Sequence, residues 1–254
     1  MRANNVKDIW AKGGHVVNGW LAIPSSVSAE IMTHAGFDSV TVDLQHGLVD
    51  YQASVGMLQA ISTLDVTPML RVPWNDPIPI MKALDAGAYG IVCPMINNRE
   101  EAEKFVGACR YYPDGYRSFG PARAAMYAGA DYATEANSTV ITMAMIETRP
   151  ALDNLDEIMS TPGLDAIYVG PADLSISLGH PPSGDPSVPE VLEAYDSILA
   201  AARRNGVVAG SHCADGAMAN RLFEKGFQFC TIANDSRLLA ISAAEQIAAA
   251  RGGK

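Results

Sequence analysis

Short apolar runs rich in β-branched residues alternate along the chain with segments of helical periodicity. The runs are nearly continuous in apolar character, which is typical of strands buried on both faces of a parallel sheet. Eight of them are predicted as strands: 16–23, 37–44, 67–73, 89–95, 139–147, 164–171, 206–213 and 227–235.

Amphipathic segments fill the gaps and are predicted as helices: 28–35, 51–62, 77–86, 99–110, 152–160, 189–205, 215–225 and 236–251. A glycine precedes the next strand at five helix-to-strand junctions, which read AGFDSV, AGAYGI, TPGLDAI, RNGVVA and KGFQF. Glycine is the residue that most readily closes a helix in the left-handed conformation. The junctions therefore predict repeated αβ turns.

Eight strand–helix units in 254 residues predict a (β/α)₈ TIM barrel. A doubly wound sheet is the alternative, but no GxGxxG follows the first strand. No linker or shift in composition divides the chain, so residues 1–254 are predicted to form a single domain. Two long loops, 111–138 and 180–187, are expected at the active face.

Composition narrows the classes of function. With 28 acidic and 18 basic residues the formal charge is −10, which argues against nucleic-acid binding. No apolar stretch reaches the roughly 18–20 residues that span a membrane. The four cysteines form no CxxC pair and three lie in apolar runs, so we expect reduced, buried thiols. The N-terminal residues show no apolar signal core. We therefore expect a cytoplasmic protein.

Charged residues at strand ends are the first candidates for chemistry, because a barrel carries its active site there. Arg71 and Glu147 interrupt or close strongly apolar runs. Glu147 and Asp173 fall on adjacent strand ends, and two such oxygen ligands with water suit Mg²⁺ or Mn²⁺. The alternative is that Glu147 caps the next helix or pairs with Arg149.

His46 is the best candidate for a general base, with Asp43 three residues earlier to orient its ring. His212 also ends a strand and is a rival. Arg71 offers a fork of donors for a carboxylate or carbonyl oxygen, or it forms a structural ion pair with Asp43 or Asp85.

The turn from Gly170 to Asp173 (GPAD) opens a short helix whose backbone N–H groups are suited to an anion. Turn chemistry alone explains the Gly-Pro pair equally well. No lysine ends a predicted strand. A Schiff-base mechanism needs a lysine at the barrel mouth, so the pattern favours metal-assisted carbonyl chemistry.

An ordered set of motifs connects these candidates: FDSVTVDLQHG, LRVPW with NDP following, ALDAGAYGIVCPM, IET and VGPADLSISLG. Over about residues 5–250 the chain resembles the HpcH/HpaI aldolases, which are metal-dependent class II aldolases of the pyruvate type. The resemblance implies a (β/α)₈ barrel that assembles as a homo-oligomer, a hexamer built as a trimer of dimers. It also implies that the last helix, here 236–250, is exchanged between neighbouring subunits.

By position, the resemblance implies a divalent metal ion (Mg²⁺, Mn²⁺ or Co²⁺) on Glu147 and Asp173. It implies that His46 is the catalytic histidine with Asp43 as its dyad partner, and that Arg71 holds the 2-oxo group.

Three further positions take their roles from the resemblance. Asp85 would support the catalytic cluster, and backbone amides around Ala172 and Asp173, after Gly170, would take the substrate carboxylate. Many members carry a glutamine where this chain has Met145. A thioether neither donates a hydrogen bond nor binds a hard cation well, so the donor arrangement there must differ.

The implied reaction is reversible aldol cleavage of a 4-hydroxy-2-oxo acid to an aldehyde and pyruvate or hydroxypyruvate. Two alternatives stay open: a lyase for acyl-CoA esters of the malyl or citramalyl type, and a non-catalytic barrel that binds 2-oxo acids. A metal-dependent hydrolase fits poorly, because such enzymes usually bring several histidine ligands and this chain has five histidines in all.

Overall fold

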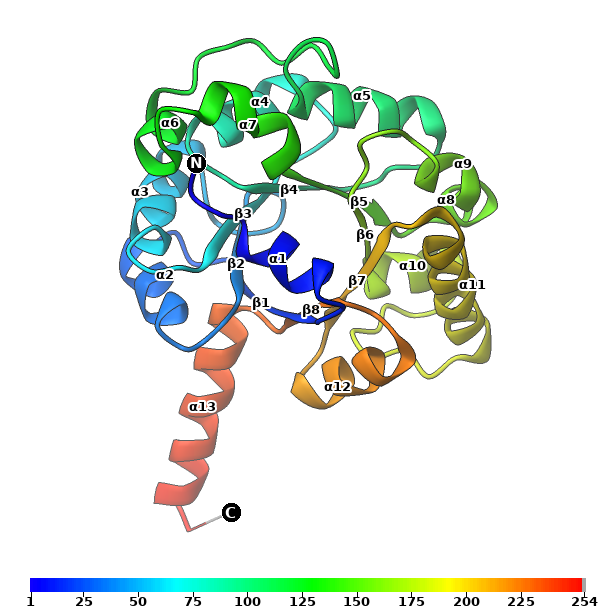
Figure 1. Ribbon diagram of the computed structural model, residues 1–254. Helices are drawn as coiled ribbons and strands as arrows, with labels where there is room; N and C mark the ends of the chain where they lie inside the picture. Colours follow the sequence, from blue (N-terminus) through cyan, green and yellow to red (C-terminus); the bar gives the residue numbers. More distant parts are fainter. Residues whose placement is uncertain (253–254) are drawn as a thin grey trace.

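The computed structural model describes residues 1–252 and confirms the predicted barrel. Eight parallel strands close in chain order, with β1 paired to both β2 and β8 (Figure 1). The strands are β1 (Val16–Leu21), β2 (Ser39–Asp43), β3 (Thr67–Arg71), β4 (Gly90–Cys93), β5 (Ile141–Ile146), β6 (Ala166–Val169), β7 (Val208–Cys213) and β8 (Phe229–Ile232). Each is shorter than or equal to its predicted run, because the apolar pattern continues into the flanking turns.

The helices surround this ring, and most follow the predicted spans. They are α1 (Asn5–Ala11), α2 (Ser26–Thr33), α3 (Tyr51–Ile61), α4 (Pro77–Asp85), α5 (Arg99–Cys109), α6 (Ala122–Ala128), α7 (Tyr132–Thr139), α8 (Arg149–Asp153), α9 (Leu155–Met159), α10 (Pro171–Ser177), α11 (Pro189–Asn205), α12 (Gly216–Lys225) and α13 (Asp235–Ala250). Several begin at a residue whose side chain accepts a first-turn N–H, including Asp50, Asn98 and Thr148.

Three helical predictions need correction. The segment 152–160 is not one helix, because the chain turns at Asn154 between α8 and α9. The segment 111–138 is not an open loop but contains α6 and α7. These helices are rich in alanine and lack a strong apolar periodicity. The N-terminal α1 was not predicted either, and it packs Val6 and Trp10 against the barrel interior.

The five predicted glycine junctions are confirmed. All five glycines have positive φ: Gly36 (97°), Gly87 (100°), Gly163 (82°), Gly206 (67°) and Gly226 (114°). A side chain is strained in this region of backbone space, so glycine is the favoured residue. The same turn therefore recurs between helix and strand around the barrel.

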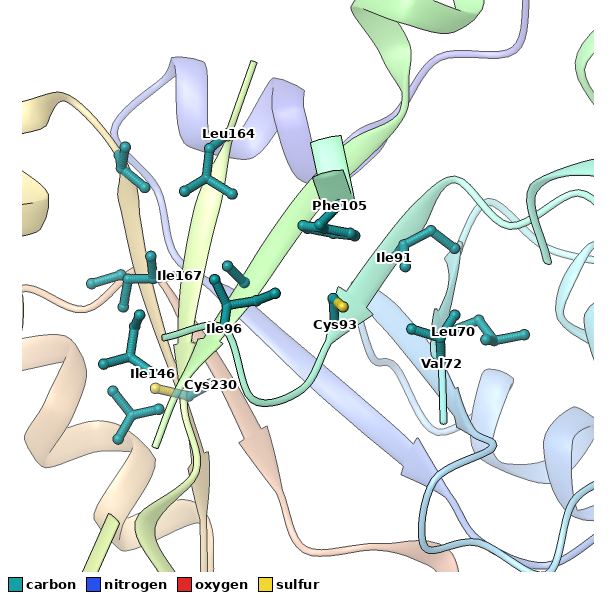
Figure 2. Close-up of a cluster of buried hydrophobic side chains, with 14 of the residues drawn as sticks. Leu70, Val72, Ile91, Cys93, Ile96, Phe105, Ile146, Leu164, Ile167 and Cys230 are labelled. Carbon is teal, nitrogen blue, oxygen red and sulfur yellow. The ribbon is translucent and has the colours of Figure 1, made fainter. Parts of the chain in front are cut away.

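Two apolar shells pack against the strands, because successive side chains point to opposite faces. On β5, Met143 and Met145 point into the barrel, whereas Ala144 and Ile146 join the shell beneath the helices. Figure 2 shows part of that outer shell, in which strand residues such as Ile91 and Cys93 lie near Phe105 of α5. This alternation decides which residue of each strand reaches the barrel interior.

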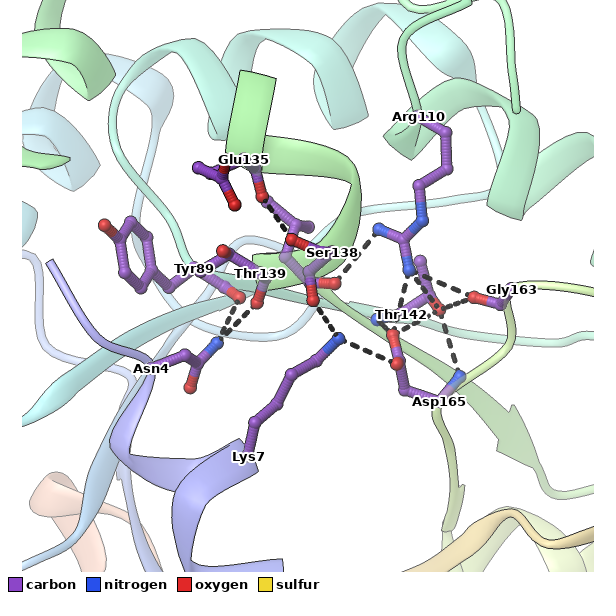
Figure 3. A network of polar contacts seen from close by, with 11 residues as sticks. Asn4, Lys7, Tyr89, Arg110, Glu135, Ser138, Thr139, Thr142, Gly163 and Asp165 are labelled. Carbon is purple, nitrogen blue, oxygen red and sulfur yellow. Dashed lines mark hydrogen bonds and ion pairs between the residues drawn. The ribbon is translucent and has the colours of Figure 1, made fainter. Parts of the chain in front are cut away.

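The amino-terminal end of the barrel is closed by α1 and a polar network (Figure 3). Asp165 accepts hydrogen bonds from Arg110 Nη2 (2.9 Å) and from the Thr142 backbone N–H (2.9 Å), and Lys7 Nζ lies 2.9 Å from its Oδ1. Lys7 also donates to the Ser138 carbonyl. The network ties the first helix to β5, β6 and the end of α7.

The C-terminal α13 extends away from the barrel (Figure 1). Its first residue, Asp235, is buried and accepts N–H groups from Ala22 and Ile23 after β1, whereas residues 236–250 are exposed. Leu239 and Ile247 are among the exposed apolar side chains.

Across residues 1–252, no helix combines the length and apolar character that crossing a membrane would require.

Candidate active site

A cavity of about 270 Å³ lies at the carboxyl ends of the barrel strands. It is lined by Trp20, Ala22, Asp43, His46, Arg71, Met145, Tyr168, Gly170, Pro171, Ala172, Asp173, Gly184, His212 and Asn234. The cavity thus gathers most of the residues that the sequence singled out. Asp85 is the exception, and Glu147 lies directly behind Gly170.

Strand alternation explains why these side chains converge. On β3, Met69 points into the barrel interior, and Arg71 takes the next inward position at the strand end. On β5 the same period leads from Met145 to Glu147. On both strands the inward-facing side chains are apolar inside the barrel, and the last one, at the carboxyl end, is charged.

Arg71 and Asp43 form a buried, bidentate ion pair. They are directly opposite each other in the β2–β3 register. Arg71 Nε and Nη2 donate to Asp43 Oδ1 (2.8 Å) and Oδ2 (2.6 Å), and both residues are at most 9% exposed. Burial by itself would raise the pKa of Asp43, but the hydrogen bonds and charge of Arg71 hold it below its ordinary value. Of the alternatives for Arg71, pairing with Asp43 is therefore the observed one.

The pairing leaves one arm of the guanidinium free. Arg71 Nη1 contacts the Met145 sulfur at 4.0 Å, and a thioether sulfur is a weak acceptor. Trp20 lies against the guanidinium, 4.9 Å from ring centroid to Cζ, and donates its indole N–H to Asp43 Oδ2. Arg71 is thus fixed on two sides while Nη1 remains available to a ligand in the cavity.

His46 is exposed on the loop after β2, where it lines the cavity. Asp43 Oδ1 accepts the backbone N–H groups of Gln45 (3.0 Å) and His46 (3.2 Å), which is an Asx turn. Gly47 permits this turn, because an added Cβ would lie 2.2 Å from the Asp43 carbonyl oxygen. The carboxylate therefore sets the path of the loop that carries His46.

This geometry corrects the expected contact between Asp43 and the His46 ring. Within the described part of the chain, the imidazole of His46 makes no hydrogen bond, and Asp43 contacts His46 through its backbone N–H. The physical reason is saturation, since Arg71, Trp20 and two backbone N–H groups already occupy the carboxylate. Asp43 positions the loop and Arg71 rather than polarising the imidazole directly.

Glu147 is only 3% exposed, yet it has no cationic partner among residues 1–252. Its Oε1 accepts the Met95 backbone N–H at 2.8 Å. Burial raises the pKa of Glu147 to about 7, the Met95 N–H opposes the rise, and the charge of Asp173 adds to it.

The two structural alternatives for Glu147 are wrong. The cap of α8 is Thr148, whose hydroxyl accepts the Ala151 N–H, and Arg149 pairs with Glu190. Glu147 is thus a carboxylate that the fold buries without neutralising it, next to a second carboxylate.

The space around Glu147 is kept open by glycine. A Cβ on Gly170 would lie 2.3 Å from Glu147 Oε2, so any larger residue would displace the carboxylate. Asp173 lies in the first turn of α10, which starts directly after Gly170. Within the described residues, no group of three or more His, Cys, Asp or Glu side chains is arranged around one point. Two carboxylates, Glu147 and Asp173, are a donor set that would fit a hard divalent cation whose other positions were filled by water or substrate.

Tyr168 and His212 complete the cavity wall. Tyr168 Oη lies 3.0 Å from His212 Nδ1, and Trp20 stacks on Tyr168 with ring centroids 5.7 Å apart. Tyr168 was missed by the sequence reasoning, because IYV reads as an ordinary buried strand. Counting inward positions on β6 from Ala166 would have pointed to it.

Asp85 does not join this cluster in the single chain. It ends α4, where Arg117 Nη2 donates to its Oδ1 at 2.6 Å. Arg123 is also engaged within the fold, with the Ala86 carbonyl and the Ser62 hydroxyl. The arginines of the 115–127 segment therefore hold α4 and α3 to that segment and do not line the cavity.

A family model described as HpcH/HpaI aldolase/citrate lyase matches residues 18–242. The chain is 41% identical over 248 residues to a hydroxypyruvate/pyruvate aldolase of Rhizorhabdus wittichii, covering 98% of this chain and 99% of that protein. It is 37% identical over 252 residues to a 4-hydroxy-2-oxo-heptane-1,7-dioate aldolase of Salmonella dublin, covering 98% and 95%.

Solved structures agree with this similarity. An HpcH/HpaI aldolase/citrate lyase family protein from Burkholderia cenocepacia superposes with a TM-score of 0.91 at 32% identity, covering 98% of this chain and 100% of that one. An HpcH/HpaI aldolase from Desulfitobacterium hafniense gives a TM-score of 0.90 at 28% identity, with 96% of both chains covered.

Proposed function

The chain belongs to the HpcH/HpaI aldolase/citrate lyase family and is an aldolase, and from this premise we propose how its cavity performs the reaction. The reaction is the reversible cleavage of a 4-hydroxy-2-oxo acid. The C4 hydroxyl loses its proton, the C3–C4 bond breaks, and an aldehyde leaves. The electron pair of that bond forms the enolate of pyruvate, or of hydroxypyruvate when C3 carries a hydroxyl group.

Arg71 is proposed to stabilise the enolate oxygen. Its Nη1 is the arm that Asp43 leaves free, and it is desolvated at the rim of the barrel. A charge-assisted hydrogen bond to a developing oxyanion strengthens as the charge appears, which is the condition for catalysis. Because Asp43 and Trp20 fix the guanidinium in advance, it needs little rearrangement during the reaction.

His46 is proposed to move the C4 hydroxyl proton. It is the imidazole on the rim whose ring is free of hydrogen bonds to residues 1–252, so both nitrogens are available to substrate or to a bridging water. Asp43 acts on it as a positioning residue through the Asx turn. In this proposal Asp43 supports both the base and the oxyanion site.

A divalent cation, Mg²⁺, Mn²⁺ or Co²⁺, is proposed to be held by Glu147 and Asp173. The support is the buried, unneutralised Glu147, the repulsion of its charge by Asp173, and the space that Gly170 leaves beside Glu147 Oε2. When bound, the cation supplies Lewis-acid stabilisation of negative charge on the substrate oxygens.

The start of α10 is proposed to anchor the substrate carboxylate. Pro171 occupies the first helical position, and the following N–H groups of Ala172 and Asp173 have no acceptor within the helix. Both residues line the cavity. This places the 2-oxo acid half of the substrate between β3, β5 and α10.

The single observation that carries this proposal is that Arg71 Nη1, which Asp43 leaves unpaired, and Asp173 line one cavity, with the buried Glu147 directly behind its Gly170 wall. The test compares pyruvate release from a 4-hydroxy-2-oxo acid with cleavage of malyl-CoA and citramalyl-CoA. Turnover of the free acid alone supports the aldolase assignment. Preferred turnover of a CoA ester contradicts it, and binding of pyruvate without turnover of either supports the non-catalytic alternative.

The exposed α13 supports a homo-oligomer, proposed as a hexamer built as a trimer of dimers with α13 exchanged between subunits. Leu239, Ile241 and Ile247 are each more than 40% exposed in the single chain, on a helix that contacts the barrel through its first turn. A second copy of the chain would remove that apolar surface from water. Light scattering on the full chain and on a chain that ends at residue 236 tests the proposal, because the shortened chain should lose the assembly. The cytoplasmic location expected from the cysteines stays a prediction.

A further inference from the structure

Opposite strands of the barrel divide the cavity into two halves. Arg71 on β3 and Glu147 after β5 bound the half assigned above to the 2-oxo acid. His212 on β7 lies four strands from Arg71 in either direction around the closed ring. Trp20 spans the distance between them, with Arg71 against its ring at 4.9 Å and the His212 ring edge-on at 5.4 Å. The aldehyde half of the substrate, beyond the C3–C4 bond, would therefore lie against the wall made by Trp20, Tyr168 and His212.

The hydrogen bond between Tyr168 and His212 decides which nitrogen of the imidazole carries the hydrogen. Burial raises the pKa of the Tyr168 phenol well above its ordinary value, so the hydroxyl keeps its hydrogen.

Among residues 1–252 the hydroxyl of the buried Tyr168 has His212 Nδ1, at 3.0 Å, as its hydrogen-bond partner, so the phenol hydrogen is donated to that nitrogen. A neutral imidazole with Nδ1 as the acceptor carries its hydrogen on Nε2. Among residues 1–252, Nε2 has no hydrogen-bond partner, and His212 is a half-buried residue whose ring lines the cavity.

The charge state of His212 decides what Nε2 can bind. Burial, the charge of Arg71 and the charge of Arg237 lower the pKa of His212 to about 4, against a smaller opposing effect of Asp43. A neutral ring offers one N–H donor without a positive charge, which suits an uncharged oxygen better than a carboxylate. Arg71, the guanidinium that lines the cavity, is already neutralised by Asp43.

We propose that His212 is a specificity-determining residue whose Nε2–H hydrogen-bonds a hydroxyl group on the aldehyde half of the substrate. The inference rests on the aldolase function proposed above and names its substrate class, the hydroxylated and uncharged aldehydes. A donor in the wall of a binding cavity discriminates between substrates, because an aldehyde without the hydroxyl leaves the N–H unpaired once the ligand has displaced water.

The test compares two substrates that differ by one hydroxyl. Cleavage of racemic 4,5-dihydroxy-2-oxopentanoate gives pyruvate and glycolaldehyde, and cleavage of 4-hydroxy-2-oxopentanoate gives pyruvate and acetaldehyde. The wild-type protein should show a kcat/KM roughly 10-fold higher for the dihydroxy acid. H212L should lose this preference by slowing the dihydroxy acid alone, so that the ratio falls to within about 2-fold of unity.

Further variants separate the proposed role from a structural one. H212Q keeps an N–H donor and should retain part of the preference, and it also serves if H212L folds poorly. Y168F removes the phenol that fixes the tautomer and should lower the ratio without abolishing pyruvate release. H34L, at an exposed histidine outside the cavity, is the matched control and should leave the ratio unchanged.

Each outcome decides the proposal. A wild-type ratio near unity, an unchanged ratio in H212L, or an equal loss on both substrates would overturn it. The ratio should also stay constant from pH 5.5 to 8.5, because Arg71, Asp43 and Arg237 face His212 with fixed charge over that range and Tyr168 remains protonated. If the wild-type protein cleaves neither acid while binding pyruvate, the aldolase function itself fails.

Discussion

Asp165 at the amino-terminal end of the barrel and Glu147 at the carboxyl end are partnered in opposite ways. At the amino-terminal end, Asp165 is saturated by Arg110, Lys7 and Thr142 (Figure 3). At the carboxyl end, Glu147 receives one backbone N–H and no cation from residues 1–252, and its pKa rises to about 7. The ion pairs of Asp165 stabilise the fold. The negative charge of Glu147 has no such partner, so only a ligand or a proton can balance it.

Backbone conformation shows the same contrast. Met95 (φ 57°) and Ala233 (φ 48°) are the non-glycine residues with left-handed backbone among residues 1–252, and both follow strands at the carboxyl end. Met95 is the residue that donates to Glu147. Strained backbone at a site is expected where the surrounding fold holds a reactive arrangement in place. Asp165, whose charge is paired, thus lies at the amino-terminal end of the barrel, whereas the left-handed residues and the uncompensated Glu147 lie at the carboxyl end.

The largest expected effect is that of His46→Ala. Loss of a general base should lower kcat by roughly 10²–10⁴-fold. The free energy of unfolding should be unchanged, because the His46 ring is exposed. Steady-state pyruvate release and urea denaturation measure the two quantities, with His34→Ala as the control. Near-normal turnover in His46→Ala would remove this residue from the role.

Glu147→Gln tests the role of the uncompensated carboxylate. We expect kcat/KM to fall by roughly 10²–10³-fold, the scale of a lost Lewis-acid contribution. In chelator the variant should be more stable than the wild type by about 3 kcal/mol at pH 8 and about equal at pH 4.

The sign follows from the pKa values. The folded protein keeps the Glu147 proton up to about pH 7, whereas the unfolded chain loses it near 4.5, so folding opposes ionisation between these values. Stability therefore falls as pH rises through that window, and glutamine removes the effect. Urea titrations at both pH values check it. A variant that is less stable than the wild type at pH 8 would show that Glu147 is a structural group.

Asp165→Asn tests the opposite end. Arg110 and Lys7 would keep their charges without a full partner, and the unfolding free energy should drop by roughly 2–4 kcal/mol. Below its melting temperature the variant should retain kcat within about 2-fold, since Asp165 is remote from the cavity.

Asp156→Asn provides the matched control, because Asp156 pairs with Arg204 on the exposed surface. Its stability should not change measurably. A large loss of kcat in folded Asp165→Asn would break the separation between the two ends.

His212 gives the smallest expected effect. Its pKa is about 4 in the folded state and 6.5 in the unfolded chain, so the unfolded state takes up a proton first as pH falls. The wild type should therefore lose about 2 kcal/mol of stability between pH 7 and pH 5 from this group, and H212L should not. Urea denaturation of both proteins at the two pH values measures the difference. Equal pH dependence would mean that the ring is not held neutral.

Strand positions and most rim residues could be predicted from the sequence, because apolar runs and strand ends are local patterns. Arg71 and Glu147 stood out as charges inside such runs. The role of Asp43 could not be predicted, because three residues of spacing allow both a ring contact and an Asx turn. Tyr168 was missed because its partners, His212 and Trp20, come from other strands.

Asp85 shows a further limit of sequence reasoning. Its placement depends on Arg117, 32 residues away in a segment predicted as a loop. A long-range ion pair of this kind leaves no local pattern.

The most direct test of the account is the metal dependence of pyruvate release from a 4-hydroxy-2-oxo acid. The protein is assayed as purified, after EDTA and removal of the chelator, and after addition of Mg²⁺, Mn²⁺ or Co²⁺, with Glu147→Gln in parallel. The account predicts that chelation abolishes turnover, that a divalent cation restores it in the wild type, and that Glu147→Gln is restored weakly at the same concentration. Full activity after complete metal removal would contradict the central claim that the carboxyl end holds Glu147 uncompensated in order to bind a cation.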